Sequence, residues 1–275
     1  MQCLLLLAIL AIPFGQNGAL ARHNRQEIDP AELIQRASEN EVRALQSAAH
    51  FRYFERLEWS WGTETREVIE TPEGRADRII EYDDEPLAPD QVGKQERRLK
   101  KLLTDAKARR HEIEDQNAEL KRRIKMMEAF PAAFIFEPLG EEHGLAVFRF
   151  RPNRSFSPKD HETQVYRGMQ GTVWVDTDQE ILTRIDGTLT RDVSFGWGIL
   201  GRLHKGGRYQ IEQRQVEPGV WRITKLALDL KLRVFLDTNK LKRNEQNTGF
   251  VPTPAGTTYK EAVEELLKSR AEAER

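Results

Sequence analysis

Residues 220–236, VWRITKLALDLKLRVFL, are the most informative stretch of the chain for its fold. Apolar side chains occupy every second position at Leu226, Leu228, Leu230, Leu232, Val234 and Leu236. The positions between them include the charged residues Lys225, Asp229, Lys231 and Arg233. Successive side chains of a strand point to opposite faces, so one face of this strand is apolar and the other is charged. The apolar face of such an antiparallel strand must cover other apolar groups, which predicts that the leucines point inward.

Shorter alternating segments that precede this stretch in the chain predict further strands. Before it, the expected strands cover residues 51–61, 64–70 and 75–82, which form a three-stranded meander. After Pro131, they cover residues 133–137, 145–151, 172–176, 181–189, 193–203 and 208–216. Tight turns with glycine, proline or aspartate separate them, so about ten strands form one large antiparallel sheet. The segment from Asn239 to Thr258 is expected to be a loop.

Few helices are available to cover this sheet. Asp29-Pro30 is a typical helix start, with Asp29 as the cap, and predicts a helix to about His50. Residues 90–130 form a highly charged helical insert whose narrow apolar stripe predicts a position peripheral to the sheet. Its basic clusters are read as solvated faces because acidic residues are interleaved with them. A last helix covers about 259–273. We therefore expect an α+β fold in which a strongly curved sheet, an incomplete β-barrel, wraps around helices on its concave side.

The N-terminus predicts export. An apolar run from Leu4 to Ile12 is followed by Ala19-Leu20-Ala21, which places small residues at the −3 and −1 positions of a signal-peptide cleavage site, although no Lys or Arg precedes the run. The run is too short to span a bilayer, and a buried N-terminal helix or strand is the alternative. We expect residues 1–21 to be removed, leaving 22–275 as a single soluble periplasmic domain. The only cysteine, Cys3, would be lost with the signal peptide.

Composition and motifs exclude several function classes. Lys plus Arg (43) nearly balances Asp plus Glu (44), which argues against a dedicated nucleic-acid-binding protein. The six histidines are scattered, and the sequence contains no HExxH, no Gly-x-Ser-x-Gly and no Walker A motif. The glycines of Gly196-Trp197-Gly198-Ile199-Leu200-Gly201 resemble a phosphate-binding loop only superficially, because the Lys and Ser/Thr of such a loop are absent and Trp lies between the glycines, so we expect a kinked strand there. We therefore expect no catalysis, no cofactor and no metal. A hydrolase whose site is assembled from dispersed residues remains the open alternative.

Aromatic and apolar residues on the expected strands predict a cavity instead. A curved sheet that is closed by few helices leaves space on its concave side, and apolar walls would suit an acyl chain. For each residue alone, ordinary core packing is the favoured explanation, and the cavity is expected from the residues taken together. The predicted lining residues are Trp59, Trp61, Trp174, Phe195, Trp197, Leu226, Leu228, Leu230, Leu232 and Val234.

The segment Gln170-Gly171-Thr172-Val173-Trp174-Val175-Asp176, with Ile181-Leu182-Thr183-Arg184-Ile185-Asp186-Gly187, resembles paired strands of the bacterial outer-membrane lipoprotein-sorting proteins, the LolA/LolB-like superfamily of periplasmic carriers. The order of helix, meander, helical insert and long strands is also similar. The resemblance implies an incomplete barrel whose hydrophobic cavity holds lipid or lipoprotein acyl chains, without cofactor or catalysis. This chain is longer, carries the charged insert and ends in an additional helix, and no residue here matches the gating arginine of the family.

The expected function is therefore that of a periplasmic binding or carrier protein for lipid or lipoprotein acyl chains, with envelope membrane proteins as further candidate partners. The alternative is an envelope-stress sensor or regulatory protein-binding module on the same scaffold, with the insert as its binding arm.

Cleavage after Ala21 makes Arg22 the expected N-terminus of the mature protein. N-terminal sequencing of the exported protein tests this expectation directly. Recovery of Met1 on a product in the cytosol would contradict both the cleavage and the compartment.

Overall fold

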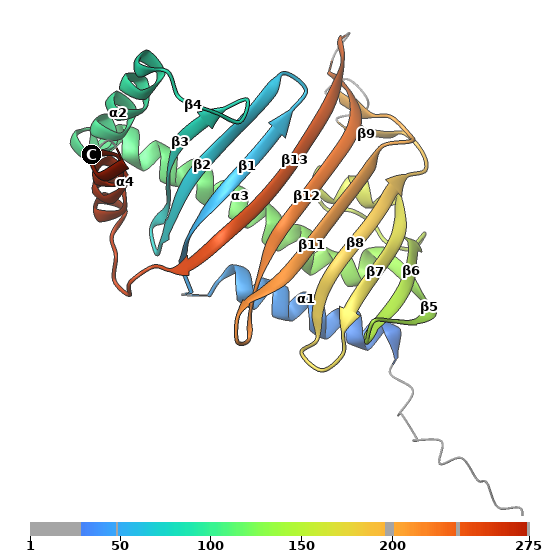
Figure 1. The fold of residues 1–275 in the computed structure, drawn as a ribbon. Coiled ribbons are helices and arrows are strands. Elements are labelled where there is room, and N and C mark those ends of the chain that lie inside the picture. Colours follow the sequence, from blue (N-terminus) through green and yellow to red (C-terminus); the bar gives the residue numbers. More distant parts are fainter. Residues whose placement is uncertain (1–28, 48, 196–200, 235–236, 274–275) are drawn as a thin grey trace, which may run out of the picture.

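The computed structural model describes residues 29–47, 49–195, 201–234 and 237–273. Over these residues the chain forms an α+β fold, in which one open antiparallel sheet of thirteen strands is combined with four α-helices (Figure 1). This confirms the fold class expected from the sequence. The expected signal peptide, residues 1–21, lies outside the described residues.

The strands follow the predicted turns closely for most of the chain. The prediction of one strand over residues 193–203 is wrong, because two short strands there pair with each other in antiparallel fashion, with Phe195 opposite Gly201. Those of the N-terminal part are β1 (Phe51–Trp59), β2 (Gly62–Thr71), β3 (Gly74–Tyr82) and β4 (Glu85–Pro86). Those of the middle part are β5 (Phe134–Glu142), β6 (Leu145–Pro152), β7 (Met169–Asp176) and β8 (Ile181–Leu189). Those of the last part are β9 (Val193–Phe195), β10 (Gly201–Leu203), β11 (Arg208–Glu217), β12 (Val220–Val234) and β13 (Asp237–Pro252).

The strand order across the sheet is β4-β3-β2-β1-β13-β12-β11-β8-β7-β6-β5, and β10 pairs with β12 and β9 beside this path. β13 therefore lies in the middle of the sheet, paired with β1 on one side and β12 on the other. The prediction of a loop from Asn239 to Thr258 is wrong over most of its length. Except for Thr238 and Leu241, all residues of β13 as far as Gln246 are charged or amide residues, so the alternation that marks a half-buried strand is absent there.

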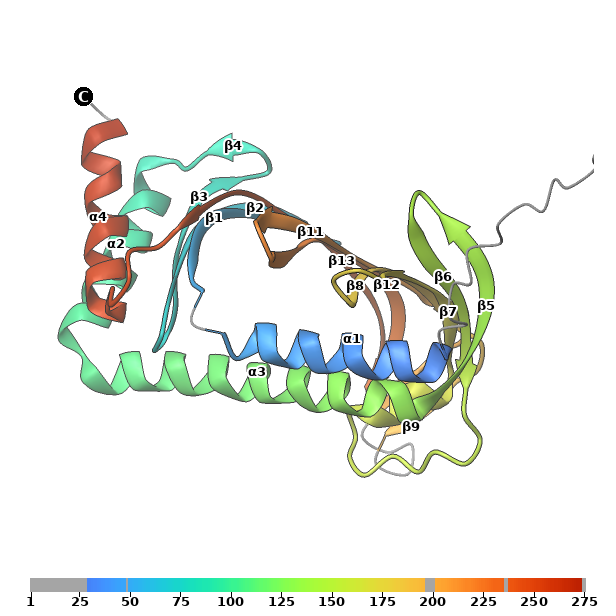
Figure 2. The same cartoon turned by 90° about the horizontal axis from the view of Figure 1, so that it is seen from below.

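The helices are α1 (Pro30–Leu45), α2 (Pro89–Thr104), α3 (Ala106–Ala133) and α4 (Tyr259–Ala273), with a short 3-10 helix, η1 (Thr163–Arg167). Asp29 caps α1 as expected, because its Oδ1 accepts a hydrogen bond from the amide of Ala31 at 2.9 Å. Figure 2 shows α1 and α3 side by side on the concave side of the sheet. α2 and α4 stand together at the β3 end.

The main core lies between the sheet and the pair α1 and α3. Leu33, Ile34 and Ala37 of α1 are buried with Phe130 of α3 against a set of strand residues that includes Phe134, Phe148, Phe150, Val173, Val175, Leu182 and Ile185. The hydroxyl of Tyr166 donates a hydrogen bond to the carbonyl of Met126 at 2.7 Å and fixes the last turns of α3. α3 thus belongs to the core at its C-terminal end.

A second core lies on the outer face of β2 and β3. Leu99 and Leu102 of α2 are buried there with Ile69, Ala76 and the apolar face of α4. The expectation that the charged insert is peripheral is therefore wrong. A narrow apolar stripe suffices to bury an insert helix when a second helix, here α4, covers the same strands.

The buried position of Leu99 generates a stability prediction. Leu99 is 0% exposed, so Leu99→Ala should lower the free energy of unfolding by about 2–5 kcal/mol. Leu103→Ala, one turn further along at a half-buried position, should cost distinctly less, and urea denaturation measures both. Deleting residues 94–125 should abolish cooperative unfolding, and a deletion variant that unfolds cooperatively would contradict this role of the insert.

Candidate ligand-binding site

The two concave-side helices bridge the sheet and leave its centre less covered. The main contacts of α1 with the sheet fall on β8 and β5, and those of α3 fall on β3 and β5. The central strands β1, β13, β12 and β11 arch over the helices between these points (Figure 2). Inward-facing apolar residues of these strands are only half-buried at Ile211, Leu226 and Leu228, although residues at the centre of a covered sheet are normally fully buried.

The leucine row of β12 runs along this part of the inner face. Leu228 packs against the main core, and Leu230 and Leu232 pack against a small cluster that consists of Leu189, Val193 and Leu203. Leu226 is half-buried and belongs to none of the buried apolar clusters of the described residues. Among the row members Leu226, Leu228, Leu230 and Leu232, Leu226 is therefore the one that packs against no buried apolar cluster.

The character of the inner face changes between β12 and β13. Leu226 lies opposite Glu245, and Leu228 lies opposite Arg243, in the register of these two strands. Residues that are directly opposite in an antiparallel pair share one face of the sheet. Apolar inner residues on β12 thus border charged inner residues on β13.

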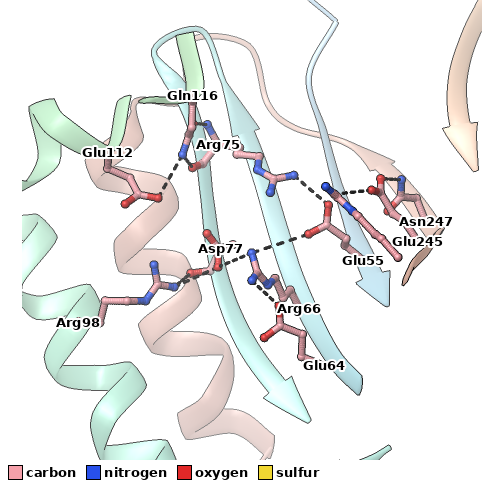
Figure 3. Close-up of polar contacts among 11 residues, drawn as sticks. Glu55, Glu64, Arg66, Arg75, Asp77, Arg98, Glu112, Gln116, Glu245 and Asn247 are labelled. Carbon is pink, nitrogen blue, oxygen red and sulfur yellow. Dashed lines mark hydrogen bonds and ion pairs between the residues drawn. The ribbon is translucent and has the colours of Figure 1, made fainter. Parts of the chain in front are cut away.

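These charged residues belong to a larger group on the inner face of the neighbouring strands β13, β1, β2 and β3. We call this group the inner charged cluster. Figure 3 shows its contacts. It consists of Glu55, Glu64, Arg66, Arg75, Asp77, Arg98, Arg243, Glu245 and Asn247.

Arg75 and Glu55 form a hydrogen-bonded ion pair within this cluster. Arg75 Nη1 donates to Glu55 Oε1 at 2.9 Å. Gln116 of α3 holds the backbone of Arg75 on both sides, because its Oε1 accepts from the Arg75 amide at 2.7 Å and its Nε2 donates to the Arg75 carbonyl at 2.8 Å. Arg98 reaches in from α2 to Asp77 at 3.1 Å. Arg66 forms an ion pair with Glu64.

The β13 side of the cluster is anchored by Glu245. Its carboxylate accepts from Arg243 Nη2 at 2.7 Å and from Asn247 Nδ2 at 2.9 Å. The guanidinium of Arg243 also lies over the ring of Trp59, 5.2 Å from its centroid. Trp59 in turn stacks on Trp61, with 5.3 Å between the ring centroids.

Four buried polar atoms of this cluster have no hydrogen-bond partner among the described residues. They are Glu55 Oε2, Asn247 Oδ1, Arg66 Nε and Arg243 Nε. A buried polar atom without a partner costs about 1–3 kcal/mol, and more when the group is charged. They are four of ten such side-chain atoms among the described residues, and their hydrogen bonds have to come from water or from another molecule.

The structure separates the predicted lining residues. Leu226, Leu228, Leu230, Leu232 and Trp59 lie on the inner face, and Trp61 is 77% exposed at the end of the β1–β2 hairpin. Trp174 lies on the outer face, opposite to the predicted side, because its neighbours Val173 and Val175 point into the main core. Its indole Nε1 donates to Glu142 at 2.7 Å, and Arg184 lies over its ring. Trp197 and the side chains of Phe195 and Val234 lie outside the described residues.

A hollow of about 570 Å³ lies over outer-face residues of the sheet. Ala227 lies in it, on β12, among longer polar residues of β8, β11 and β13. Over the described part of the chain, no group of His, Cys, Asp and Glu could hold a metal ion, and no helix is long and apolar enough to cross a membrane.

α1 carries a buried carboxyl group, that of Glu41, on the concave side of the sheet next to β11 and β8. Glu41 is buried, and its Oε1 accepts a hydrogen bond from Gln213 Nε2 at 2.6 Å. Burial disfavours the charged form and raises the pKa of Glu41 to about 7, although Gln213 and the charges of Arg123 and Arg222 oppose this shift. Gln213 also donates to the carbonyl of Leu182, so this pair ties α1 to β11 and β8.

The raised pKa of Glu41 predicts how stability depends on pH. The unfolded carboxyl group titrates near 4.5, so between pH 4.5 and 7 the unfolded state loses a proton that the folded state keeps. The contribution of Glu41 is complete below pH 4.5 and is lost by about pH 7. The free energy of unfolding of the wild type, minus that of Glu41→Gln, should therefore fall by up to about 3 kcal/mol over this range.

Urea unfolding at a series of pH values measures this difference. Glu39→Gln, at an exposed position of the same helix, serves as the control and should follow the wild type. A constant difference between the wild type and Glu41→Gln would show that Glu41 stays ionised.

The sequence matches no protein-family model, and no curated protein sequence is significantly similar to it. The two strands that carry the resemblance to the lipoprotein-sorting proteins do pair with each other as β7 and β8, with Val173 opposite Ile185. Membership of that superfamily stays a prediction that rests on residues 170–187 and on the order of elements.

Proposed function

We propose that this protein is a non-catalytic binding or carrier protein for lipid or lipoprotein acyl chains, and that it acts after export to the periplasm. The single observation that carries the proposal is the half-buried apolar row at the centre of the concave side, around Leu226, Leu228 and Ile211. Export rests on the N-terminal sequence alone.

The helices leave apolar area of the inner face partly uncovered around Ile211, Leu226 and Leu228. Burying an apolar side chain fully is worth about 1.5–3 kcal/mol relative to leaving it exposed, and each buried CH₂ group of a ligand is worth about 0.8 kcal/mol. An acyl chain laid along the inner face of β12 would gain both contributions. The charged face of the same strand, with Lys225, Asp229 and Lys231, points to the opposite side and gives no such gain.

Leu226 distinguishes ligand contact from ordinary core packing. Leu226→Ala should lower the stability less than Leu228→Ala, because Leu228 packs against the main core and Leu226 does not. Leu226→Glu should abolish binding of a fluorescent fatty-acid analogue, since a carboxylate would have to be desolvated beneath the acyl chain. Fluorescence titration and urea unfolding of each variant provide the two measurements.

Lys231→Glu is the matched control, because it introduces the same side chain on the charged face of the same strand and should leave probe binding unchanged. If the wild type binds no apolar probe, the carrier proposal fails. A regulatory protein-binding function then becomes the favoured alternative for this fold. If Leu226→Ala destabilises the protein as strongly as Leu228→Ala, the row is ordinary core.

A further inference from the structure

We infer that the inner charged cluster binds the head group of a zwitterionic lipid that carries a primary ammonium group. The inference rests on the proposed function and adds a specificity to it. The acyl chain would lie along the leucine row of β12, and the head group would lie on the adjacent inner face of β13, β1 and β2.

The ammonium position follows from two unpartnered acceptors. Glu55 and Asn247 lie directly opposite each other on β1 and β13, and both are buried, with exposed fractions of 1% and 7%. Glu55 Oε2 and Asn247 Oδ1 lack a donor among the described residues. An ammonium group offers three N–H donors and no acceptor, so one such group can satisfy both oxygens.

Arg66 controls access to Glu55 Oε2. Glu55 Oε1 is already held by Arg75 at 2.9 Å, whereas Oε2 is 4.0 Å from Arg66 Nη1. That distance is too long for a hydrogen bond, and Arg66 has Glu64 as its close partner. Arg66 can therefore move towards Glu64 and open Oε2 to a ligand without losing its own carboxylate.

The phosphate position follows from the unpartnered donors. Arg66 lies opposite Glu55 on β2, and Arg243 lies opposite Leu228 on β13, at the border with the leucine row. The Nε atoms of both are buried without an acceptor. Phosphate oxygens are strong acceptors for guanidinium groups, so a phosphate on this face supplies what these arginines lack.

The charge balance of the cluster favours a zwitterion over a ligand with a net charge. Its four carboxylates are Glu55, Glu64, Asp77 and Glu245, and its four guanidinium groups are those of Arg66, Arg75, Arg98 and Arg243. The eight charges therefore sum to zero. A ligand with a net charge would add an unbalanced charge beside the buried carboxylate of Glu55, which is costly, whereas a zwitterion preserves the balance.

Lysolipids that share one acyl chain and differ only in head group test the inference on the full mature chain. The probes are the lysophospholipids with ethanolamine, choline and glycerol head groups, titrated calorimetrically below their micelle concentrations. The ethanolamine lipid should bind about tenfold more tightly than the other two, the difference expected for hydrogen bonds to a charged group. The quaternary ammonium of choline has no N–H to donate, and the glycerol lipid carries a net negative charge.

Glu55→Gln should remove this preference and bind the ethanolamine and choline lipids equally. Glu58→Gln, on the outer face of the same strand and paired with Lys242, should keep it. Equal affinities of the wild type for all three lipids would overturn the head-group inference and leave acyl-chain binding intact, with water completing the cluster. If none of the three lipids binds, the proposed function itself fails. The comparison among lipids on the wild type stands even if Glu55→Gln does not fold.

Discussion

The double pairing of β13, with β1 on one side and β12 on the other, is the constraint on which the rest of the structure depends. It joins the N-terminal meander to the strands that follow residue 200, and so makes one sheet of segments that lie far apart in the sequence. It also brings the leucine row of β12 beside the charged inner residues of β13. The mixed character of the interior is therefore a direct consequence of the strand order.

The helices α1 and α3 connect strands that lie far apart in the sheet. α3 reaches from β3 at one end to β5 at the other, and α1 lies beside it against β8. Buried ion pairs add little net stability compared with apolar residues of the same volume, so the inner charged cluster is not explained by stability alone. Binding of a polar ligand group would explain more simply why this cluster contains charged residues and unpartnered polar atoms.

The strands with strict alternation could be predicted from the sequence, and so could the cap of α1. β12 and the pair β7 and β8 were predictable because one face of each strand is apolar. β13 was not, because much of its inner face meets other charges rather than a core. The inner charged cluster was missed for the same reason, since charged residues on a strand normally indicate its solvent face. The side on which Trp174 lies could not be decided locally, because valines and tryptophan alternate there and either set could face inward.

The central claim is that an acyl chain occupies the concave side along β12. Photo-crosslinking with a fatty acid that carries a diazirine near its methyl end, followed by mapping of the labelled peptides, tests this most directly. We expect adducts on β11 and β12 at inward-facing residues such as Ile211 and Leu226. Adducts confined to the exposed Trp61 or to the outer-face hollow around Ala227, or no adducts at all, would contradict it.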